Sequence, residues 1–159
     1  MKKFELTREF ITFLGRKLFR IKALVEFGDV KAGELGGYVE KEENINHEGN
    51  ARVYGNARVS GDARVYGDAR VYGDALVVKQ EDIIFTAAKF GTIFRTTTAY
   101  RTTDGVQINC GCFSGNLEEF REQITQTREG RMREKYLHHA DEIEMYFDLD
   151  LEKEEKEGE

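Results

Sequence analysis

A six-residue pattern of small, apolar and polar positions dominates the middle of the chain. Residues 49–78 form five consecutive hexads, in which Gly is followed by Asn or Asp, then by Ala, and two positions later by Val. Because six is even, every copy of a position falls on the same side of an extended chain, whereas a helical period of 3.6 would scatter Ala and Val. Gly, Asn and Asp tolerate the positive φ of a corner. The pattern predicts short parallel strands that coil with three sides per turn.

The segments on either side of the hexads predict caps for this coil. Before the hexads the Gly and aliphatic rhythm continues irregularly, with Val30, Leu35, Val39 and Ile45 as expected inward residues. Stretches 82–88, 91–101 and 106–110 are rich in β-forming residues, and apolar stripes predict helices from residue 117 and over 131–147. We therefore expect four parts: an N-terminal hairpin cap (1–24), a β-helix (25–80), an α+β unit of a small antiparallel sheet and two α-helices (81–150), and an acidic disordered tail (151–159).

The hexads resemble the hexapeptide-repeat family of left-handed parallel β-helices, an architecture shared by trimeric acyltransferases and some carbonic anhydrases. The small and aliphatic pairs from Ala51/Val53 to Ala75/Val77 carry this resemblance. The stretch 18–78, together with the later sequence GCFSGNLEEF, also looks like a hypothetical protein common in phages and prophages. The resemblance implies a mainly β fold with a short left-handed β-helix, a homotrimer and a phage origin. Few turns bury little core, which also favours a trimer; a monomer capped by its own termini is the alternative.

One outward face of the predicted coil is rich in arginine and tyrosine. If one turn takes about 18 residues, positions 18 apart stack at the inter-strand spacing of about 4.8 Å. Arg52 should then lie over Arg70, and Tyr54 over Tyr72. These four residues are the candidate protein interface, either between subunits or with a host protein.

Charge and composition exclude several classes of function. The 159 residues carry a net charge of -6, and the hexads hold four Arg against three Asp, so no basic stripe exists for bulk nucleic acid. No run of about 18 apolar residues predicts a membrane span, and the start MKKFELTREF lacks the apolar stretch of a secretory signal. We expect a cytoplasmic protein, in the host cytoplasm if a phage encodes it, without a membrane partner.

Residues for catalysis or metal binding are sparse. His47 is the one histidine near the coil and sits in a polar loop, while His138 and His139 diverge by about 100° on a predicted helix. Cys110 and Cys112 supply only half of a tetrahedral zinc site. We therefore expect no catalytic residue, no metal and no cofactor, and the two cysteines are interpreted as small apolar residues.

Binding of a small anion is the better prospect. A predicted strand offers cations, hydroxyls and an aromatic ring, and a predicted helix start offers free N–H groups that suit phosphate. We hypothesise a non-catalytic phage-type protein that sequesters a small phosphate-bearing, nucleotide-like ligand, such as a host defence signal. The alternatives are a structural or protein-interaction module that docks on a host protein, and a degenerate acyltransferase relative that uses His47. The candidate ligand-binding residues are Arg95, Thr97, Tyr100, Arg101, Ser114, Gly115 and Asn116.

Overall fold

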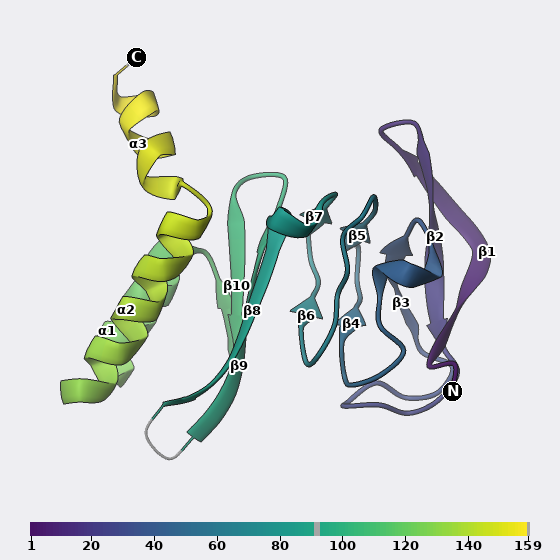
Figure 1. Ribbon diagram of the computed structural model, residues 1–159, viewed down its shortest axis with the longest axis horizontal. Coiled ribbons are helices and arrows are strands. Elements are labelled where there is room, and N and C mark those ends of the chain that lie inside the picture. Colours follow the sequence, from purple (N-terminus) through teal and green to yellow (C-terminus); the bar gives the residue numbers. More distant parts are fainter. Residues whose placement is uncertain (91–92, 159) are drawn as a thin grey trace.

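The computed structural model describes residues 1–90 and 93–158, and Figure 1 shows their parts in a row. An N-terminal hairpin lies at one end, the hexad region follows, and an antiparallel sheet separates it from the helices. The described residues are mainly β and include three α-helices. Gly91, Thr92 and Glu159 lie outside the described residues, so the predicted strand 91–101 is seen as β9 (Ile93–Arg101).

The hexad region has parallel strands on two sides and a single parallel bridge on the third. On one side, β3 (Leu35–Val39), β5 (Arg58–Val59) and β7 (Leu76–Val77) are parallel neighbours. On the second side, β4 (Arg52–Val53) pairs with β6 (Arg70–Val71), and on the third a single parallel bridge joins Ile45 to Val65. The repeating Ala and Val of every hexad, from Ala51/Val53 to Ala75/Val77, point inward and are at most 2% exposed.

The corner glycines behave as their positions predict. All five hexad glycines have φ between +61° and +73°, a region that residues with a Cβ rarely adopt. The two 3-10 turns, η1 (Glu42–Asn44) and η2 (Gln80–Asp82), form equivalent corners before Ile45 and Ile83. In each, the third residue accepts a hydrogen bond from the backbone N–H before the turn, Asn44 from Lys41 at 2.9 Å and Asp82 from Lys79 at 3.0 Å.

The β-helix predicted over 25–80 is present only in part. The hairpin of β1 (Phe4–Phe13) and β2 (Arg16–Ala23) extends the first side antiparallel to β3, so the five-stranded sheet β1-β2-β3-β5-β7 is mixed. Val39 and Ile45 are buried as expected, but Val30 is only half-buried and Leu35 is 48% exposed. Leu35 begins β3 opposite Lys22 of the hairpin, at the rim and not above the core.

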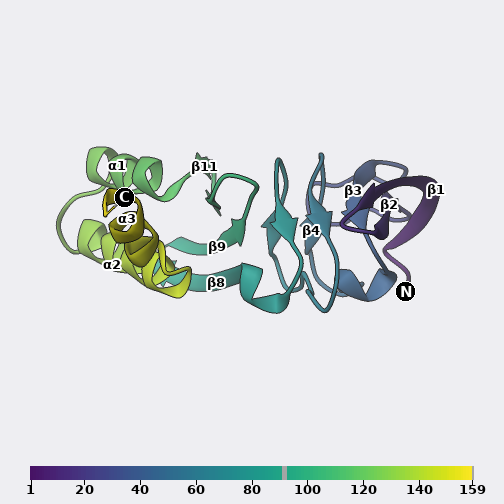
Figure 2. The ribbon, with the colours of Figure 1, turned by 90° about the horizontal axis from the view of Figure 1, so that it is seen from above.

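The C-terminal part is a four-stranded antiparallel sheet covered by helices. Its order is β11-β10-β9-β8, from β8 (Ile83–Phe90), β9, β10 (Val106–Cys110) and β11 (Phe113–Gly115). Figure 2 shows this sheet between the hexad region and the helices α1 (Leu117–Thr127), α2 (Gly130–Tyr146) and α3 (Leu149–Glu157).

The acidic segment departs from its expected disorder. Residues 149–157 form α3, a third helix where a disordered tail over 151–159 was expected. Leu149 packs against the core between sheet and helices, and Glu152 forms an ion pair with Arg101 of β9 at 3.2 Å. These two contacts hold the first turn of a segment whose composition alone predicts a solvated chain.

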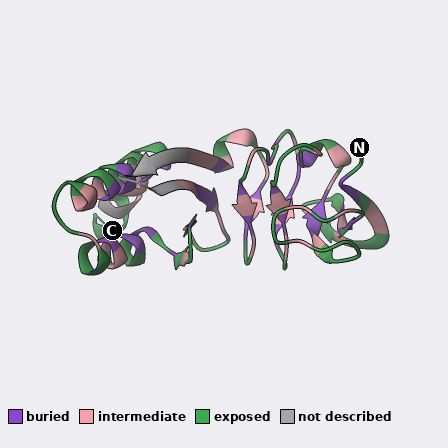
Figure 3. Cartoon of the chain, turned by 90° about the horizontal axis from the view of Figure 1, so that it is seen from below, coloured by how far each residue is buried: buried purple, intermediate pink, exposed green. Residues whose placement is uncertain are grey.

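The sheet separates two hydrophobic cores, visible as buried stretches in Figure 3. Side chains alternate along β9, so Ala99 faces the helices with Phe120 and Ile143, while Tyr100 joins the core of the hexad region. One short strand thus supplies side chains to both cores.

Polar side chains of the sheet close one end of the hexad region. Thr98 Oγ1 accepts a hydrogen bond from Arg70 N (3.1 Å), and Asn109 Nδ2 donates to Arg70 O (3.0 Å). The Tyr100 hydroxyl donates to Tyr72 O (2.9 Å) and accepts from Tyr72 N (3.3 Å) and Asn109 Nδ2 (2.9 Å). Backbone groups of an edge strand need partners when buried, and here side chains replace a further strand.

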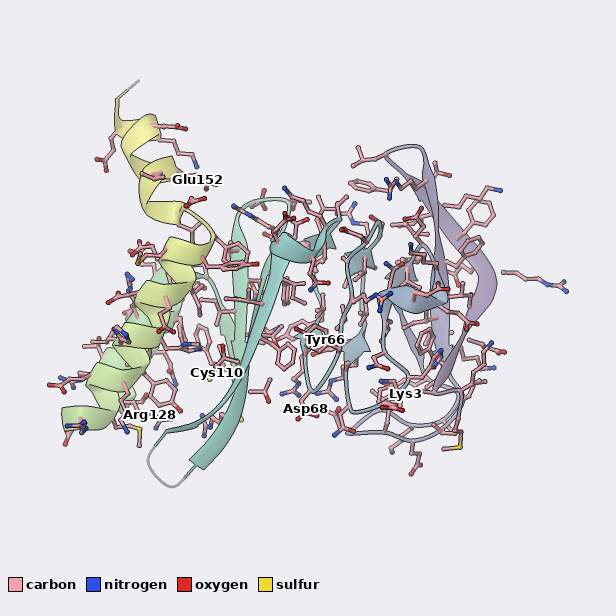
Figure 4. The ribbon with its side chains drawn as sticks, viewed as in Figure 1. Lys3, Tyr66, Asp68, Cys110, Arg128 and Glu152 are labelled. Carbon is pink, nitrogen blue, oxygen red and sulfur yellow. The ribbon has the colours of Figure 1, made fainter. Side chains whose placement is uncertain are left out.

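The N-terminal hairpin closes the opposite end. Phe4 is buried in the core of the hexad region, and Lys3 Nζ donates to Ala51 O (2.8 Å) and Gly49 O (3.3 Å). Figure 4 shows Lys3 at this end of the molecule. Both ends are therefore capped by the chain's own termini, which removes the open ends from which a partner subunit was inferred. The homotrimer stays a prediction.

We expect the stability of the protein to depend on pH through Lys3. Burial lowers the pKa of Lys3 to about 8, so between pH 8 and the unfolded value of 10.5 the unfolded chain holds more protons. We expect the free energy of unfolding from urea titrations to rise with pH from 7.5 to 9.5. Lys3→Met should flatten that rise, and parallel curves for the two proteins would contradict the assignment.

Candidate functional site

The structure does not bring the predicted ligand-binding residues together. Tyr100 is fully buried and its hydroxyl serves the end of the hexad region, as described above. Thr97 is 2% exposed and donates its hydroxyl hydrogen to Cys110 Sγ (3.2 Å). Neither side chain is accessible to a ligand here, because both are buried and hydrogen-bonded within the protein. One face of β9 carries polar side chains because that face meets unpaired backbone groups of the hexad region.

The Arg101 side chain is also held by contacts within the protein. Its guanidinium donates to Phe147 O (2.9 Å) and to Glu152 (3.2 Å), and it lies over the Phe147 ring at 5.2 Å. It joins β9 to the turn between α2 and α3. A guanidinium held by a carboxylate in this way is not offered to an anion.

The predicted helix start is closed by side chains of the chain itself. Asn116 Oδ1 accepts from Glu119 N (2.9 Å), and Glu119 Oε2 accepts from Asn116 N (2.8 Å), which forms a capping box. Ser114 accepts a hydrogen bond from Gln107 (2.6 Å), and Gly115 is buried against Glu119. A neighbouring cavity has a volume of about 510 Å3, and its net negative charge disfavours a phosphate. Its charged lining residues are one cation, Lys156, and four carboxylates, Asp74, Asp104, Glu118 and Glu152.

Arg95 lies in a different cleft, of about 250 Å3, between the strand ends and the helices. Arg128, the residue after α1, contributes the second cation, and its guanidinium lies over the Tyr136 ring at 5.4 Å. Figure 4 shows Cys110 of β10 and Arg128 near this side of the sheet. The cleft is lined by Arg95, Cys110, Cys112, Phe113, Phe120, Gln123, Ile124, Thr127, Arg128 and Tyr136.

The charge of this Arg95–Arg128 cleft is not neutralised. No Asp or Glu is among its described lining residues, and within the described chain neither guanidinium has an ion-pair partner. Other arginines differ: Arg121, for example, contacts Asp141 (2.7 Å) and Glu144 (2.8 Å). Arg128 belongs to no motif and the sequence analysis did not identify it. Its only signal was the charged run TREGRMR, which spans the connection between α1 and α2 and the first turn of α2.

The arginine and tyrosine face stacks as predicted. Arg52 pairs with Arg70 across β4 and β6, and the Tyr54 and Tyr72 rings stack with centroids 4.7 Å apart. Asp29, which the sequence did not single out, forms ion pairs with both arginines. Burial, and then the neighbouring Arg70, lower the pKa of Arg52. The positive charge of this face is thus partly neutralised within the chain.

His47 has structural contacts at both ring nitrogens. Nδ1 accepts from Lys3 N (3.1 Å), Nε2 lies 3.6 Å from Glu42, and the ring stacks on Phe4 at 4.4 Å. These contacts place it in the N-terminal cap. His138 and His139 diverge on α2, with side chains 77% and 7% exposed. The described residues hold no group of three or more His, Cys, Asp or Glu side chains that could bind a metal ion.

Comparison with known proteins identifies the repeat only. Two segments, 51–67 and 63–78, match the family model of the YdcK β-solenoid repeat, while both caps lie outside the match. No curated protein shows significant similarity to the chain. None of the described helices combines the length and apolar character needed to cross a membrane. The hexad region is therefore a β-solenoid repeat within a mainly β chain.

Proposed function

We propose that this protein binds a small anionic ligand, of the phosphate-bearing class, in the Arg95–Arg128 cleft and acts without catalysis. One observation carries the proposal: two guanidinium groups line one cleft without a carboxylate among its described residues. The other arginines predicted to bind a ligand or to form an interface have acidic partners: Arg101 pairs with Glu152, and Arg52 and Arg70 pair with Asp29. Arg95 is the member of the predicted ligand set that the proposal keeps.

The chemistry of the cleft suits a phosphate attached to an apolar or aromatic group. Guanidinium groups present paired N–H donors that match phosphate oxygens. Phe113, Phe120 and Tyr136 supply aromatic surface next to these donors. At about 250 Å3 the cleft is smaller than most ligand pockets, so we propose a ligand of mononucleotide size or less.

The wider setting of this function rests on the hexad resemblance. We propose a left-handed coil, a homotrimer and a phage-encoded protein that works in the host cytoplasm by sequestering a nucleotide-like signal. Five hexads of the Gly-Asn/Asp-Ala-x-Val type support the coil. The trimer has weaker support than the sequence suggested, since both solenoid ends are already capped by the chain's own termini.

Replacing either arginine of the cleft is expected to weaken ligand binding. A hydrogen bond to a charged group contributes about 1.5–3 kcal/mol, so Arg95→Gln and Arg128→Gln should each weaken affinity roughly 10- to 100-fold. Isothermal titration calorimetry with a panel of nucleoside monophosphates, cyclic nucleotides and inorganic phosphate measures this effect. Affinity should also fall with added salt.

Arg64→Gln is the matched control. Arg64 is exposed on the solenoid, and its described contacts to Gln80 use the backbone and leave the guanidinium without an ion pair. This variant should bind as the wild type does. Absence of binding to every member of the panel, or equal losses in all three variants, would contradict the proposal.

Docking on a protein through the solenoid face is the second candidate function. The stacked Tyr54 and Tyr72 rings, beside Arg52 and Arg70, favour it, because tyrosine and arginine are enriched in interfaces. It becomes the leading account if the calorimetric panel shows no binding. The degenerate acyltransferase has no supporting contact, since His47 is held within the N-terminal cap.

A further inference from the structure

The Arg95–Arg128 cleft also contains both cysteines of the chain, which anion binding does not use. Cys110 ends β10, and Gly111 with Cys112 forms the tight turn to β11, where Cys110 pairs with Phe113. Gly111 has φ +60°, which the turn requires. Both thiols are free, but Cys112 is exposed and Cys110 is buried. One thiol at the cleft is therefore open to a reagent from solvent.

Arginine side chains surround this turn. A Cβ placed on Gly111 would lie 2.9 Å from Arg95 Nη1, so the guanidinium packs against the backbone between the two cysteines. Arg70 Nη1 donates to Gly111 O at 3.4 Å, and Arg128 lines the same cleft. A cleft with unneutralised positive charge concentrates anionic reagents relative to neutral or cationic ones. The thiol of Cys112 thus lies beside the two arginines of the proposed anion site.

We propose that Cys112 is a thiol–disulfide exchange site selective for anionic low-molecular-weight disulfides. The inference rests on the proposed anion site and names a reaction there. The Cys112 thiolate attacks one sulfur of the disulfide, a new S–S bond forms to Cys112 Sγ, and the old S–S bond breaks. Its electron pair leaves with the second sulfur as a thiolate. Cys112 is oxidised, the released thiol is the reduced product, and excess thiol reverses the step.

Cys110 differs in accessibility and contacts. It is 4% exposed, and its Sγ accepts the Thr97 hydroxyl hydrogen at 3.2 Å. Its side chain belongs to the core between sheet and helices. A disulfide reagent reaches Cys112 without displacing this core, so the adduct should form on Cys112 alone.

Intact-mass kinetics with three disulfides tests the selectivity. The probes are oxidised glutathione, which is anionic, 2-hydroxyethyl disulfide, which is neutral, and cystamine, which is cationic. With the neutral reagent as reference, we expect wild type to react on the order of tenfold faster with the anionic than with the cationic probe. The double variant Arg95→Gln/Arg128→Gln should lose most of that ratio, while Arg64→Gln should keep it.

Cysteine variants locate the reacting sulfur. Cys112→Ser, at an exposed position, should form no adduct, and Cys110→Ala should form it at the wild-type rate. An adduct on Cys112→Ser, equal rates for anionic and cationic probes, or a charge preference that survives the double arginine variant would each overturn the inference. Calorimetry of the wild type with inorganic phosphate, in excess thiol that keeps Cys112 reduced, keeps the two proposals separate. Anion binding there without anion-selective exchange overturns this inference and leaves the proposed anion site intact.

Discussion

Tyr100→Ala is expected to lower the free energy of unfolding by about 3–5 kcal/mol, the range for truncating a large buried aromatic side chain. Tyr100 is fully buried at the junction of the solenoid core and the sheet. Its removal also leaves Tyr72 O and Asn109 Nδ2 without the hydroxyl that binds them. Urea unfolding followed by circular dichroism measures the loss.

Tyr100→Phe isolates the contribution of the hydroxyl. Leaving buried partners unsatisfied costs about 1–3 kcal/mol, so the variant should lose that much. Burial raises the pKa of Tyr100 to about 12, above the unfolded value of 10.0. The neutral Tyr100 hydroxyl therefore contributes its full stabilisation below pH 10, and this contribution is lost as pH rises from 10 to 12. The free energy of unfolding of Tyr100→Phe should not show this fall. Tyr66→Phe, at a ring 48% exposed, is the control and should change little. Equal stabilities of Tyr100→Phe and wild type would contradict the capping role.

Gly37→Ala should destabilise the protein by about 1–3 kcal/mol or more through overpacking. An added Cβ would lie 2.7 Å from Ala57 O and 2.8 Å from Val53 Cγ1, both inside the solenoid. Ala57 O already accepts the backbone hydrogen bond of Tyr38 at 2.9 Å, so moving it weakens the pairing of β3 with β5. Thermal unfolding of the variant measures this effect.

Gly55→Ala is the matched control for this glycine. Gly55 has φ +64°, and its added Cβ would meet nothing closer than 3.6 Å, so only the conformational cost of about 1 kcal/mol applies. Gly37 has no positive φ and should show the larger loss. If Gly55→Ala is the more damaging change, close packing at β3 does not explain Gly37.

The period of six predicts the solenoid well because it acts through the backbone. Once each turn takes 18 residues, the inward Ala and Val and the stacked Arg52/Arg70 and Tyr54/Tyr72 pairs follow from register alone. The irregular turns before the hexads lack this constraint. There the chain enters through an antiparallel hairpin, which leaves Leu35 at the rim.

The candidate site was harder to predict because its residues depend on docking between distant segments. Thr98 and Tyr100 are polar because the sheet meets the unpaired edge of β6, a contact that no local pattern reports. Arg101 donates a hydrogen bond to Glu152, and this contact depends on the folding of α3, which carries Glu152. Arg128 joins Arg95 only when the helices cover the sheet. Of the predicted ligand set, Arg95 alone lines the cleft.

Arginine side-chain NMR gives the most direct test of the anion site. In ¹H–¹⁵N spectra that resolve Nε–H signals, titration with a nucleoside monophosphate should shift Arg95 and Arg128 and leave Arg52 of the solenoid face in place. The shifts should saturate together with the calorimetric binding curve. Shifts confined to Arg52 and Arg70, with Arg95 and Arg128 unmoved at saturation, would contradict the assignment of the cleft.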